Sequence, residues 1–333
     1  MAISQWVVAY LPKADVKTHS PCEIATGISC PRNDKCAGVR KRKKLSHFSG
    51  FSGMMLWVIH PLVDCIYPAW AYHWEDNMGY TDLIFDLYGT LVDIHTEEDA
   101  AVWERTALYF GYHGASYTGP GLEAAFHAAM AAREARAGQS YECFPDIPFE
   151  DVMAELFRAA GVRAEVEALG VGAARLFRIA STEYIRLYPG VLTALATLRA
   201  RGYRLWLLSN AQQVFTTCEL RHLGLDGCFD GVYLSSAYGC RKPDGRFFRA
   251  LLEGEGLDPA RCLMIGNDRQ TDIAGARALG LGTLHLHTAL TPAEQAAAEP
   301  SLHPACCTGP HYELEGSDWA ALTRLLCGLE EGT

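Results

Sequence analysis

The fold of this chain is decided at residues 83–93, which read Leu-Ile-Phe-Asp-Leu-Tyr-Gly-Thr-Leu-Val-Asp. The apolar run Leu83–Phe85 is flanked by polar residues, as is typical of a short buried parallel strand. It ends at Asp86, and Gly89 marks the turn that follows. A carboxylate directly after such a strand lies at the edge of the sheet where open α/β folds bind their ligands.

The same arrangement recurs further along the chain. Strands are predicted at 203–208, 231–235, 262–265 and 283–286, and helices at 191–200, 214–223, 245–254 and 271–279. Strands that alternate with helices indicate a parallel sheet with helices on both faces. The sequence therefore predicts a three-layer α/β fold.

A long insertion follows the first strand, because residues 96–187 read as one helix after another. Thr96 and Asp99 form an approximate capping box ahead of the first of these helices, and another helix is predicted over 149–157. We expect the insertion to fold as a separate, all-helical cap. The expected core then consists of residues 78–95 and 188–290, completed by 291–333.

Residues 1–77 differ in kind from the rest of the chain. They carry nine Lys and Arg against six Asp and Glu, whereas residues 78–333 carry twenty against thirty-three. The apolar stretch 54–74 is interrupted by Pro, Asp and His, which are costly in the core of a bilayer. We expect residues 1–77 to be either a disordered appendage or an over-extended start ahead of Met78.

Composition limits the classes of function. The chain has 333 residues, of which 49% are hydrophobic and 20% charged, as in globular proteins. Its net charge of −10 argues against wholesale binding to nucleic acid or to an anionic membrane. Twelve cysteines without a CxxC pair indicate reduced thiols and a cytoplasmic protein. No pattern indicates the oligomeric state.

Polar side chains follow four of the predicted strands. They are Asp86, Ser209-Asn210, Lys242 and Asn267-Asp268. Because the carboxyl ends of parallel strands meet at one edge of a sheet, we expect these groups to share one crevice. The sequence thus predicts a nucleophilic carboxylate beside a hydroxyl, an amide, a fixed cation and a second carboxylate.

In order and spacing, these segments resemble the four motifs of the haloacid dehalogenase-like (HAD) hydrolase superfamily. The corresponding stretches are residues 86–93, 207–210, 241–244, and 265–268 with 272–276. The insertion falls where members with a helical cap between motifs one and two carry theirs. The resemblance covers about residues 80–290 and implies a Rossmann-like core.

The resemblance also implies roles for the residues at these positions. Asp86 would be the nucleophile that forms an aspartyl ester or aspartyl phosphate. Lys242 would offset negative charge on Asp86 and on the substrate, while Thr90, Ser209 and Asn210 would bind the transferred group.

A magnesium ion is implied as well. Asp268, helped by Asn267 or Asp272, would hold Mg²⁺ together with Asp86 and the backbone carbonyl of Tyr88. These are the oxygen ligands that Mg²⁺ prefers.

Tyr88 departs from the pattern of the phosphatases, most of which carry Asp there as general acid and base. Tyrosine, with a pKa of about 10, can donate a proton but is a poor base at neutral pH. The variant resembles the 2-haloacid dehalogenases, whose halide leaving group needs no proton. Against those enzymes, Asp268 keeps an acidic ligand, Phe248 stands where they carry Tyr, and only Arg105 and Arg133 suggest themselves as clamps for a substrate carboxylate.

We therefore expect a Mg²⁺-dependent phosphatase of a small metabolite, slow because Tyr88 replaces the usual acid and base. Two alternatives stay open: a 2-haloacid dehalogenase or other carbon–heteroatom hydrolase, and a binding or regulatory protein that has lost useful catalysis. His285 and His287 alternate on the last predicted strand and allow a shared metal face, although ordinary strand polarity is the simpler explanation.

Overall fold

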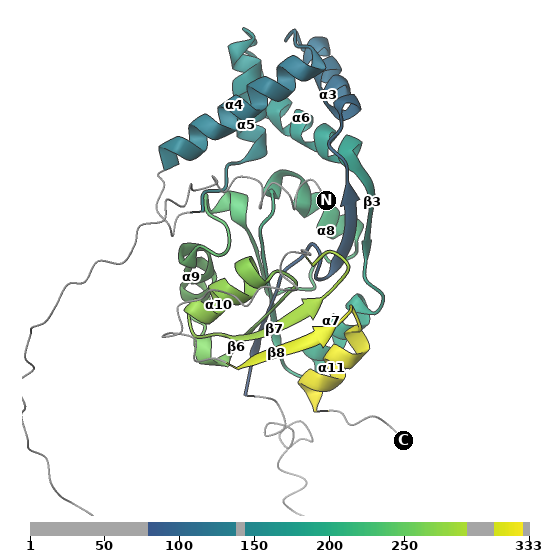
Figure 1. The fold of residues 1–333 in the computed structure, drawn as a ribbon, viewed down its shortest axis with the longest axis vertical. Coiled ribbons are helices and arrows are strands. Elements are labelled where there is room, and N and C mark those ends of the chain that lie inside the picture. Colours follow the sequence, from purple (N-terminus) through teal and green to yellow (C-terminus); the bar gives the residue numbers. More distant parts are fainter. Residues whose placement is uncertain (1–78, 138–143, 292–309, 329–333) are drawn as a thin grey trace, which may run out of the picture. The chain divides into compact units, whose positions relative to one another are not determined.

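The computed structural model of the chain describes residues 79–137, 144–291 and 310–328. Its central sheet has six strands in the order β5-β4-β1-β6-β7-β8, and every neighbouring pair is parallel (Figure 1). The strands are β1 (Asp82–Phe85), β4 (Arg204–Ser209), β5 (Gly231–Leu234), β6 (Cys262–Gly266), β7 (Gly282–His287) and β8 (His311–Glu315).

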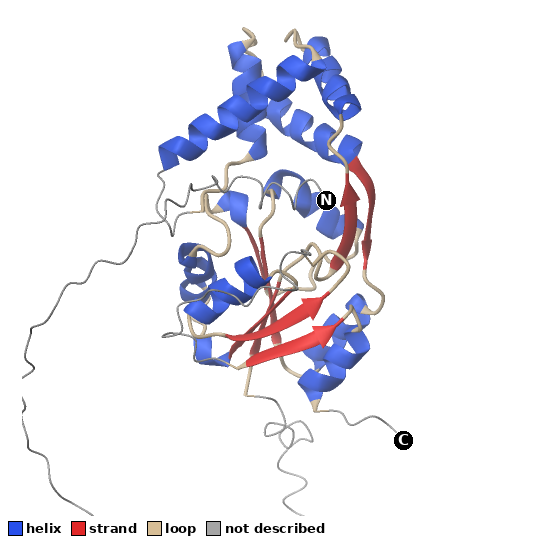
Figure 2. Ribbon diagram, viewed as in Figure 1, coloured by secondary structure: helices blue, strands red, loops and turns tan. Residues whose placement is uncertain are grey.

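Helices cover both faces of this sheet (Figure 2). Leu83 and Phe85 of β1 belong to a hydrophobic core with α7 (Val191–Ala200), α8 (Gln213–His222) and α11 (Trp319–Cys327). Ile84 points the other way, into a second core with α9 (Gly245–Gly254) and α10 (Ala274–Ala278). Successive residues of a strand point to opposite faces, so a strand that is apolar throughout is buried on both sides. The predicted three-layer α/β core is confirmed.

Four helices after β1 build a hydrophobic core of their own, and we call them the cap. They are α3 (Ala100–Tyr112), α4 (Gly119–Ala137), α5 (Phe149–Ala159) and α6 (Val166–Ser181). Aromatic rings fill the centre of the cap: the centroids of Trp103 and Phe177 lie 4.7 Å apart, and those of Phe110 and Phe157 3.8 Å apart.

A two-stranded antiparallel ribbon flanks the cap in sequence. It consists of β2 (Val92–Thr96) and β3 (Thr182–Leu187), so the last part of the insertion is a strand where we predicted helix. The predicted capping box was also wrong. Thr96 belongs to β2, and Asp99 alone caps α3 by accepting a hydrogen bond of 2.9 Å from the amide of Val102.

Two elements extend the core beyond the last predicted strand, namely β8 and α11. In α11, Trp319, Leu322 and Leu326 are buried in the core shared with β1. The helix predicted over 271–279 overlaps a π-helical turn, Arg269–Ile273, and the α-helix α10 begins only after that turn. The predictions for residues 1–77 lie outside the described residues.

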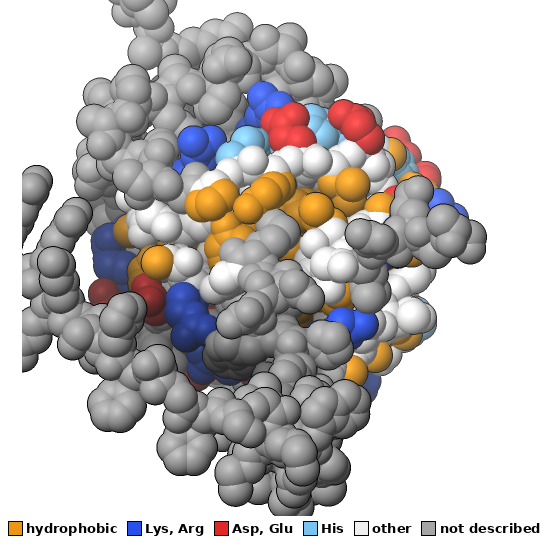
Figure 3. Space-filling model, turned by 90° about the horizontal axis from the view of Figure 1, so that it is seen from below, with side chains coloured by type: hydrophobic (Ala, Val, Ile, Leu, Met, Phe, Trp, Pro, Cys, Tyr) orange, Lys and Arg blue, Asp and Glu red, His pale blue; other side chains and the backbone are white. Residues whose placement is uncertain are grey.

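The surface of the described ranges is not uniformly polar. Leu192 of α7 and Leu325 of α11 are exposed. Seen from below, hydrophobic side chains gather in the middle of the visible face, with charged and histidine side chains along its rim (Figure 3). None of the described helices combines the length and the apolar character needed to cross a membrane.

Candidate active site

Asp86 lies directly after β1, and its side chain is almost completely buried. Its Oδ1 accepts hydrogen bonds from Nζ of Lys242 at 2.8 Å and from Oγ of Ser209 at 3.0 Å. Its Oδ2 accepts a longer bond of 3.3 Å from Oγ1 of Thr90. The two oxygens are therefore held unequally, and Oδ2 is the one more available to a substrate.

Lys242 follows β5 and is fully buried. Its Nζ lies 2.6 Å from Oδ1 of Asp272 and donates a further hydrogen bond of 2.8 Å to the carbonyl of Leu208. Burial alone would lower the pKa of Lys242, but Asp272 and Asp86 outweigh burial and the net shift is upward. The side chain is therefore a fixed cation between two carboxylates.

Asp272 is buried beneath the loop that follows β6. Its Oδ2 accepts a hydrogen bond of 3.1 Å from the amide of Asp268, and a Cβ at Gly266 would lie 2.2 Å from that oxygen. Burial raises the pKa of Asp272 although Lys242 opposes the shift. Since both carboxylate oxygens contact protein groups, the geometry favours Asp272 as the residue that positions Lys242.

Asn210 clamps the backbone of Lys242. Its Nδ2 donates to the carbonyl of Lys242 at 3.0 Å, and its Oδ1 accepts from the amide of Lys242 at 2.7 Å. An amide nitrogen carries two hydrogens, so one donor is left for a ligand. Its predicted contact with the transferred group stays a prediction, whereas the clamp is a role that we did not anticipate.

Thr90 connects Asp86 with the loop after β6. Its buried hydroxyl lies 3.1 Å from Oδ1 of Asn267, in addition to its contact with Asp86. Gly89 beside it has a φ of +82°, and a Cβ there would lie 2.4 Å from Nδ2 of Asn267. Only glycine allows this close approach in this backbone conformation.

Asp268 caps the π-helical turn that follows it. Its Oδ1 accepts hydrogen bonds from the amides of Gln270 at 2.7 Å and Thr271 at 3.0 Å. The backbone amides of the turn thus orient the Asp268 carboxylate.

Tyr88 points into a cluster that the sequence did not suggest. Its hydroxyl donates a short hydrogen bond to the Glu219 carboxylate and lies 2.9 Å from Oγ1 of Thr216. The guanidinium of Arg178 lies 5.2 Å from the centre of the Tyr88 ring and bonds Glu219 at 2.5 and 3.2 Å. Burial raises the pKa of Tyr88; Arg178 opposes the shift and Glu219 adds to it. The proton of Tyr88 is therefore held firmly.

Arg178 is the buried arginine of the cap. It lies on α6, one helical turn after the buried Ala174, and no pattern in the sequence indicated that this arginine would be buried. The two arginines that we singled out lie elsewhere: Arg105 is exposed on α3, and Arg133 pairs with Glu155 at 2.9 Å. Phe248 is buried in the core beside α10.

The loop that precedes α5 is bound to the core next to Lys242. The carbonyl of Phe144 accepts a hydrogen bond of 2.8 Å from the amide of Arg241, and the amide of Asp146 donates one of 3.2 Å to Gly239. Asp146 also accepts hydrogen bonds from Gln212 and Ser235. Backbone and side-chain contacts thus join the insertion to the segment that carries Lys242.

Comparison with known proteins supports the motifs. Over 111 residues, the chain is 34% identical to the glyceraldehyde 3-phosphate phosphatase of Methanothermobacter thermautotrophicus; the match covers 33% of this chain and only 49% of that enzyme. Over 189 residues, it is 32% identical to the phosphoserine phosphatase of Thermus thermophilus, covering 55% of this chain and 73% of that enzyme.

Among solved structures, the HAD-hydrolase YfnB from Bacillus subtilis bound to magnesium aligns with 74% of this chain and with 98% of its own, at 20% identity and a TM-score of 0.42. Residues 83–280, more than half of the chain, match the family model of haloacid dehalogenase-like hydrolases. Within the matched residues, Ser209 and Lys242 contact Asp86, and Asp272 contacts Lys242. The chain belongs to the haloacid dehalogenase-like hydrolase family.

Proposed function

We propose that the protein is a phosphatase that hydrolyses a small phosphorylated metabolite through an aspartyl phosphate on Asp86. The observation that carries the proposal is the buried carboxylate of Asp86, held at one oxygen by Lys242 and Ser209 and more loosely at the other. The phosphatase names of two similar enzymes support the class of substrate.

The reaction follows from the arrangement around Asp86. Oδ2 attacks phosphorus, the bond between phosphorus and the substrate oxygen breaks, and that oxygen takes a proton from water. Water then attacks the phosphorus of the aspartyl phosphate, the bond to Oδ2 breaks, phosphate leaves, and the proton of the attacking water passes to solvent. The charge of Lys242 and the second hydrogen on Nδ2 of Asn210 would stabilise charge on the phosphoryl oxygens. The Ser209 hydroxyl donates its one hydrogen to Oδ1 of Asp86 and would orient the nucleophile.

The residues around Asp86 fit a divalent cation. Three carboxylates, those of Asp86, Asp268 and Asp272, outnumber the one buried ammonium of Lys242, and both Asp86 and Asp268 raise the pKa of Asp272. The predicted ligands are Asp86, the Tyr88 carbonyl, Asn267, Asp268 and Asp272, all of which offer oxygen. When bound, Mg²⁺ would neutralise phosphate oxygens beside a carboxylate nucleophile.

The test is hydrolysis of p-nitrophenyl phosphate by the full chain, with Mg²⁺ and with EDTA, beside Asp86→Asn. Asp99→Asn is the matched control, because Asn caps helices as well as Asp does and the change lies on α3. We expect activity that requires Mg²⁺ and Asp86 but survives Asp99→Asn. Activity that persists in Asp86→Asn would contradict the nucleophile, and activity unaffected by EDTA would contradict the metal.

A second candidate is supported by Tyr88. The Tyr88 hydroxyl is bound to Glu219, so Tyr88 is not free to protonate a leaving group. A halide leaving group needs no proton. Release of halide from a 2-haloacid in EDTA, abolished by Asp86→Asn, would replace the phosphatase by a dehalogenase. If neither substrate is cleaved, a binding role for the same fold becomes the better proposal.

A further inference from the structure

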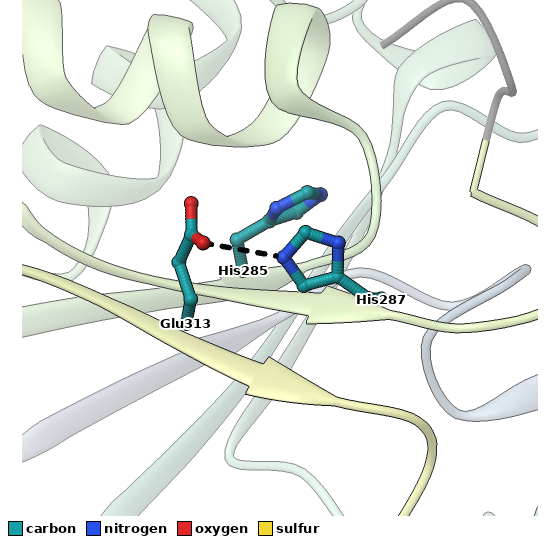
Figure 4. Close-up of side chains that lie close together, drawn as sticks. All are labelled: His285, His287 and Glu313. Carbon is teal, nitrogen blue, oxygen red and sulfur yellow. Dashed lines mark ion pairs between the residues drawn. The ribbon is translucent and has the colours of Figure 1, made fainter. Parts of the chain in front are cut away.

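We propose that His285, His287 and Glu313 form a binding site for a divalent transition-metal ion, with Zn²⁺ as the ion that their donor atoms suit best. The three side chains come from two neighbouring strands and gather on one face of the sheet (Figure 4). Among the described residues, this is the one group of three His, Cys, Asp or Glu side chains whose ligand atoms all lie within 4.8 Å of one another.

The pairing of β7 with β8 brings the residues together. His285 and His287 are two residues apart on β7 and therefore share a face. Glu313 stands opposite His285 in the parallel register. The register of the two strands therefore places three potential metal ligands close together on one face.

The distance between His287 and Glu313 fits a metal better than a hydrogen bond. Nε2 of His287 lies 3.4 Å from Oε2 of Glu313, and it is buried without a hydrogen-bond partner among the described residues. Two ligand atoms bound to zinc at about 2.1 Å in tetrahedral geometry are about 3.4 Å apart. The observed distance between His287 Nε2 and Glu313 Oε2 therefore equals the distance between two ligand atoms of a tetrahedral zinc site.

His285 has the hydrogen bond that metal-binding histidines usually make. Its Nε2 lies 3.1 Å from the carbonyl of Asn267, which only an N–H can satisfy, so Nδ1 carries the lone pair. The Nε of Arg269 also points at Nδ1 of His285, as expected if Nδ1 is the acceptor. A ring whose other nitrogen is held by a carbonyl is oriented to bind a metal through Nδ1.

Glu313 is oriented in a similar way. Its Oε1 is bound by Arg269 at 2.8 Å and by Nε2 of His311 at 3.2 Å, which turns Oε2 toward His287. Arg269 is also the competing cation, since its Nε lies 3.4 Å from Nδ1 of His285. That contact is long, so an ion on Nδ1 would replace a weak hydrogen bond.

The donor set selects the kind of metal. Two imidazoles and one carboxylate suit Zn²⁺ and its borderline neighbours, whereas Mg²⁺ prefers oxygen ligands alone. Because His285 is bonded to the carbonyl of Asn267, an ion here would also hold the loop beside Asp86. None of its three donor atoms belongs to a proposed Mg²⁺ ligand.

The experiment titrates the full chain with Co²⁺ in saturating Mg²⁺, then displaces it with Zn²⁺. Tetrahedral Co²⁺ with nitrogen and oxygen ligands absorbs strongly in the visible range, while thiolate ligands add a near-ultraviolet band and six-coordinate Co²⁺ absorbs weakly. We expect one Co²⁺ with a tetrahedral spectrum that lacks the thiolate band.

Two variants locate that ion: His287→Ala and Glu313→Gln, each at a partly exposed side chain. We expect each to weaken binding by at least about 10-fold, while His222→Ala, an exposed histidine at the end of α8, leaves binding unchanged. Circular dichroism without metal checks that both variants fold. Unchanged binding in both variants, a six-coordinate or thiolate spectrum in the unaltered protein, or no bound ion would overturn the proposal.

Discussion

One buried ammonium, that of Lys242, lies between the carboxylates of Asp86 and Asp272 at 2.8 and 2.6 Å. Without it, two negative charges would face each other out of contact with water. The desolvation cost of such charges is high unless they are paired. Lys242 is therefore as important for stability as for the proposed chemistry.

Replacing Lys242 by Met tests this. We expect the free energy of unfolding to fall by about 3–5 kcal/mol, the usual cost of removing one partner of a buried ion pair, and hydrolysis to be lost. Urea denaturation measures the first effect. Arg221→Met, which removes an arginine paired with Asp226 where both side chains are exposed, is the control and should cost only about 1 kcal/mol or less. Equal losses in the two variants would show that burial of Lys242 does not matter.

Tyr88 offers a second test at the same scale. Because its proton is held by Glu219, Tyr88→Phe should change the rate of phosphate-ester hydrolysis only slightly. If Tyr88 were the general acid, the rate would drop by about 10²–10⁴-fold. Tyr88→Asp supplies a carboxylate that can act as acid and base, and we expect it to accelerate hydrolysis. Steady-state kinetics of both variants decide between these outcomes.

At the scale of elements, α6 of the cap and α8 of the core are joined by Arg178 and Glu219. The side chain of Arg178 is 4% exposed and that of Glu219 13%. The pair also packs beside Phe215, whose ring centre lies 4.8 Å from the guanidinium. A buried pair of this kind fixes which surfaces of two helices meet.

Glu219→Gln should therefore destabilise the protein by about 2–5 kcal/mol, because Arg178 keeps its charge but loses its partner. It also removes the charged acceptor of the Tyr88 hydroxyl. Glu167→Gln is the matched control, since that glutamate pairs with Arg158 at an exposed position and should leave the unfolding midpoint unchanged. A control variant as unstable as Glu219→Gln would argue against a special role for the α6–α8 pair.

The loop before α5 predicts a dependence on pH. Burial raises the pKa of Asp146 from 3.8 to about 6, partly opposed by Ser235, Arg241 and Gln212. The folded protein then binds more protons than the unfolded chain between about pH 4 and 6, so the contribution of Asp146 to stability falls as pH rises through that range, by at most about 3 kcal/mol.

We expect Asp146→Asn to remove this effect. Urea unfolding of both proteins from pH 4 to pH 7 should show the unaltered protein losing stability relative to the variant as pH rises. Parallel curves over that range would contradict the prediction.

Strands β1, β4 and β6 could be predicted because each contains a continuous apolar run with a polar residue just after it. Strand β3 could not be predicted. Four of its six side chains are charged or polar and three are exposed, so its apolar residues show no strand periodicity. β8 alternates His, Glu and Glu with Tyr and Leu and follows a long connection, so its short pattern was missed.

For the candidate active site, too, the sequence predicted local positions but not contacts between distant helices. The positions of Asp86, Ser209 and Lys242 after strands follow from local patterns, and the structure brings these side chains together. The contact of Tyr88 with Glu219 joins residues 131 positions apart. Such a pairing depends on how helices pack, which no spacing within one element encodes.

At the scale of the whole molecule, the C-terminal helix closes the core that begins with β1. The ring centres of Trp319 and Phe85 lie 6.1 Å apart, although the residues come from opposite ends of the described chain. Residues 310–328 are therefore part of the fold that holds Asp86 in place.

Trp319→Ala should cost about 3–5 kcal/mol of stability, as is usual for a large side chain removed from a core. Leu325→Ala on the same helix is the control: its side chain is 40% exposed, and we expect a loss of about 1 kcal/mol or less. Thermal unfolding of the full chain measures both. Similar midpoints for the two variants would show that α11 is peripheral.

The ribbon of β2 and β3 has a consequence for engineering. Thr96 and Thr182 are partners in its register, so the chain leaves and returns at neighbouring points about 5 Å apart. A two-residue turn is long enough to join such ends. Another module with closely spaced termini can therefore replace the 85 or so residues between them without cutting the sheet that carries Asp86, provided that it also supplies a cation for the buried carboxylate of Glu219.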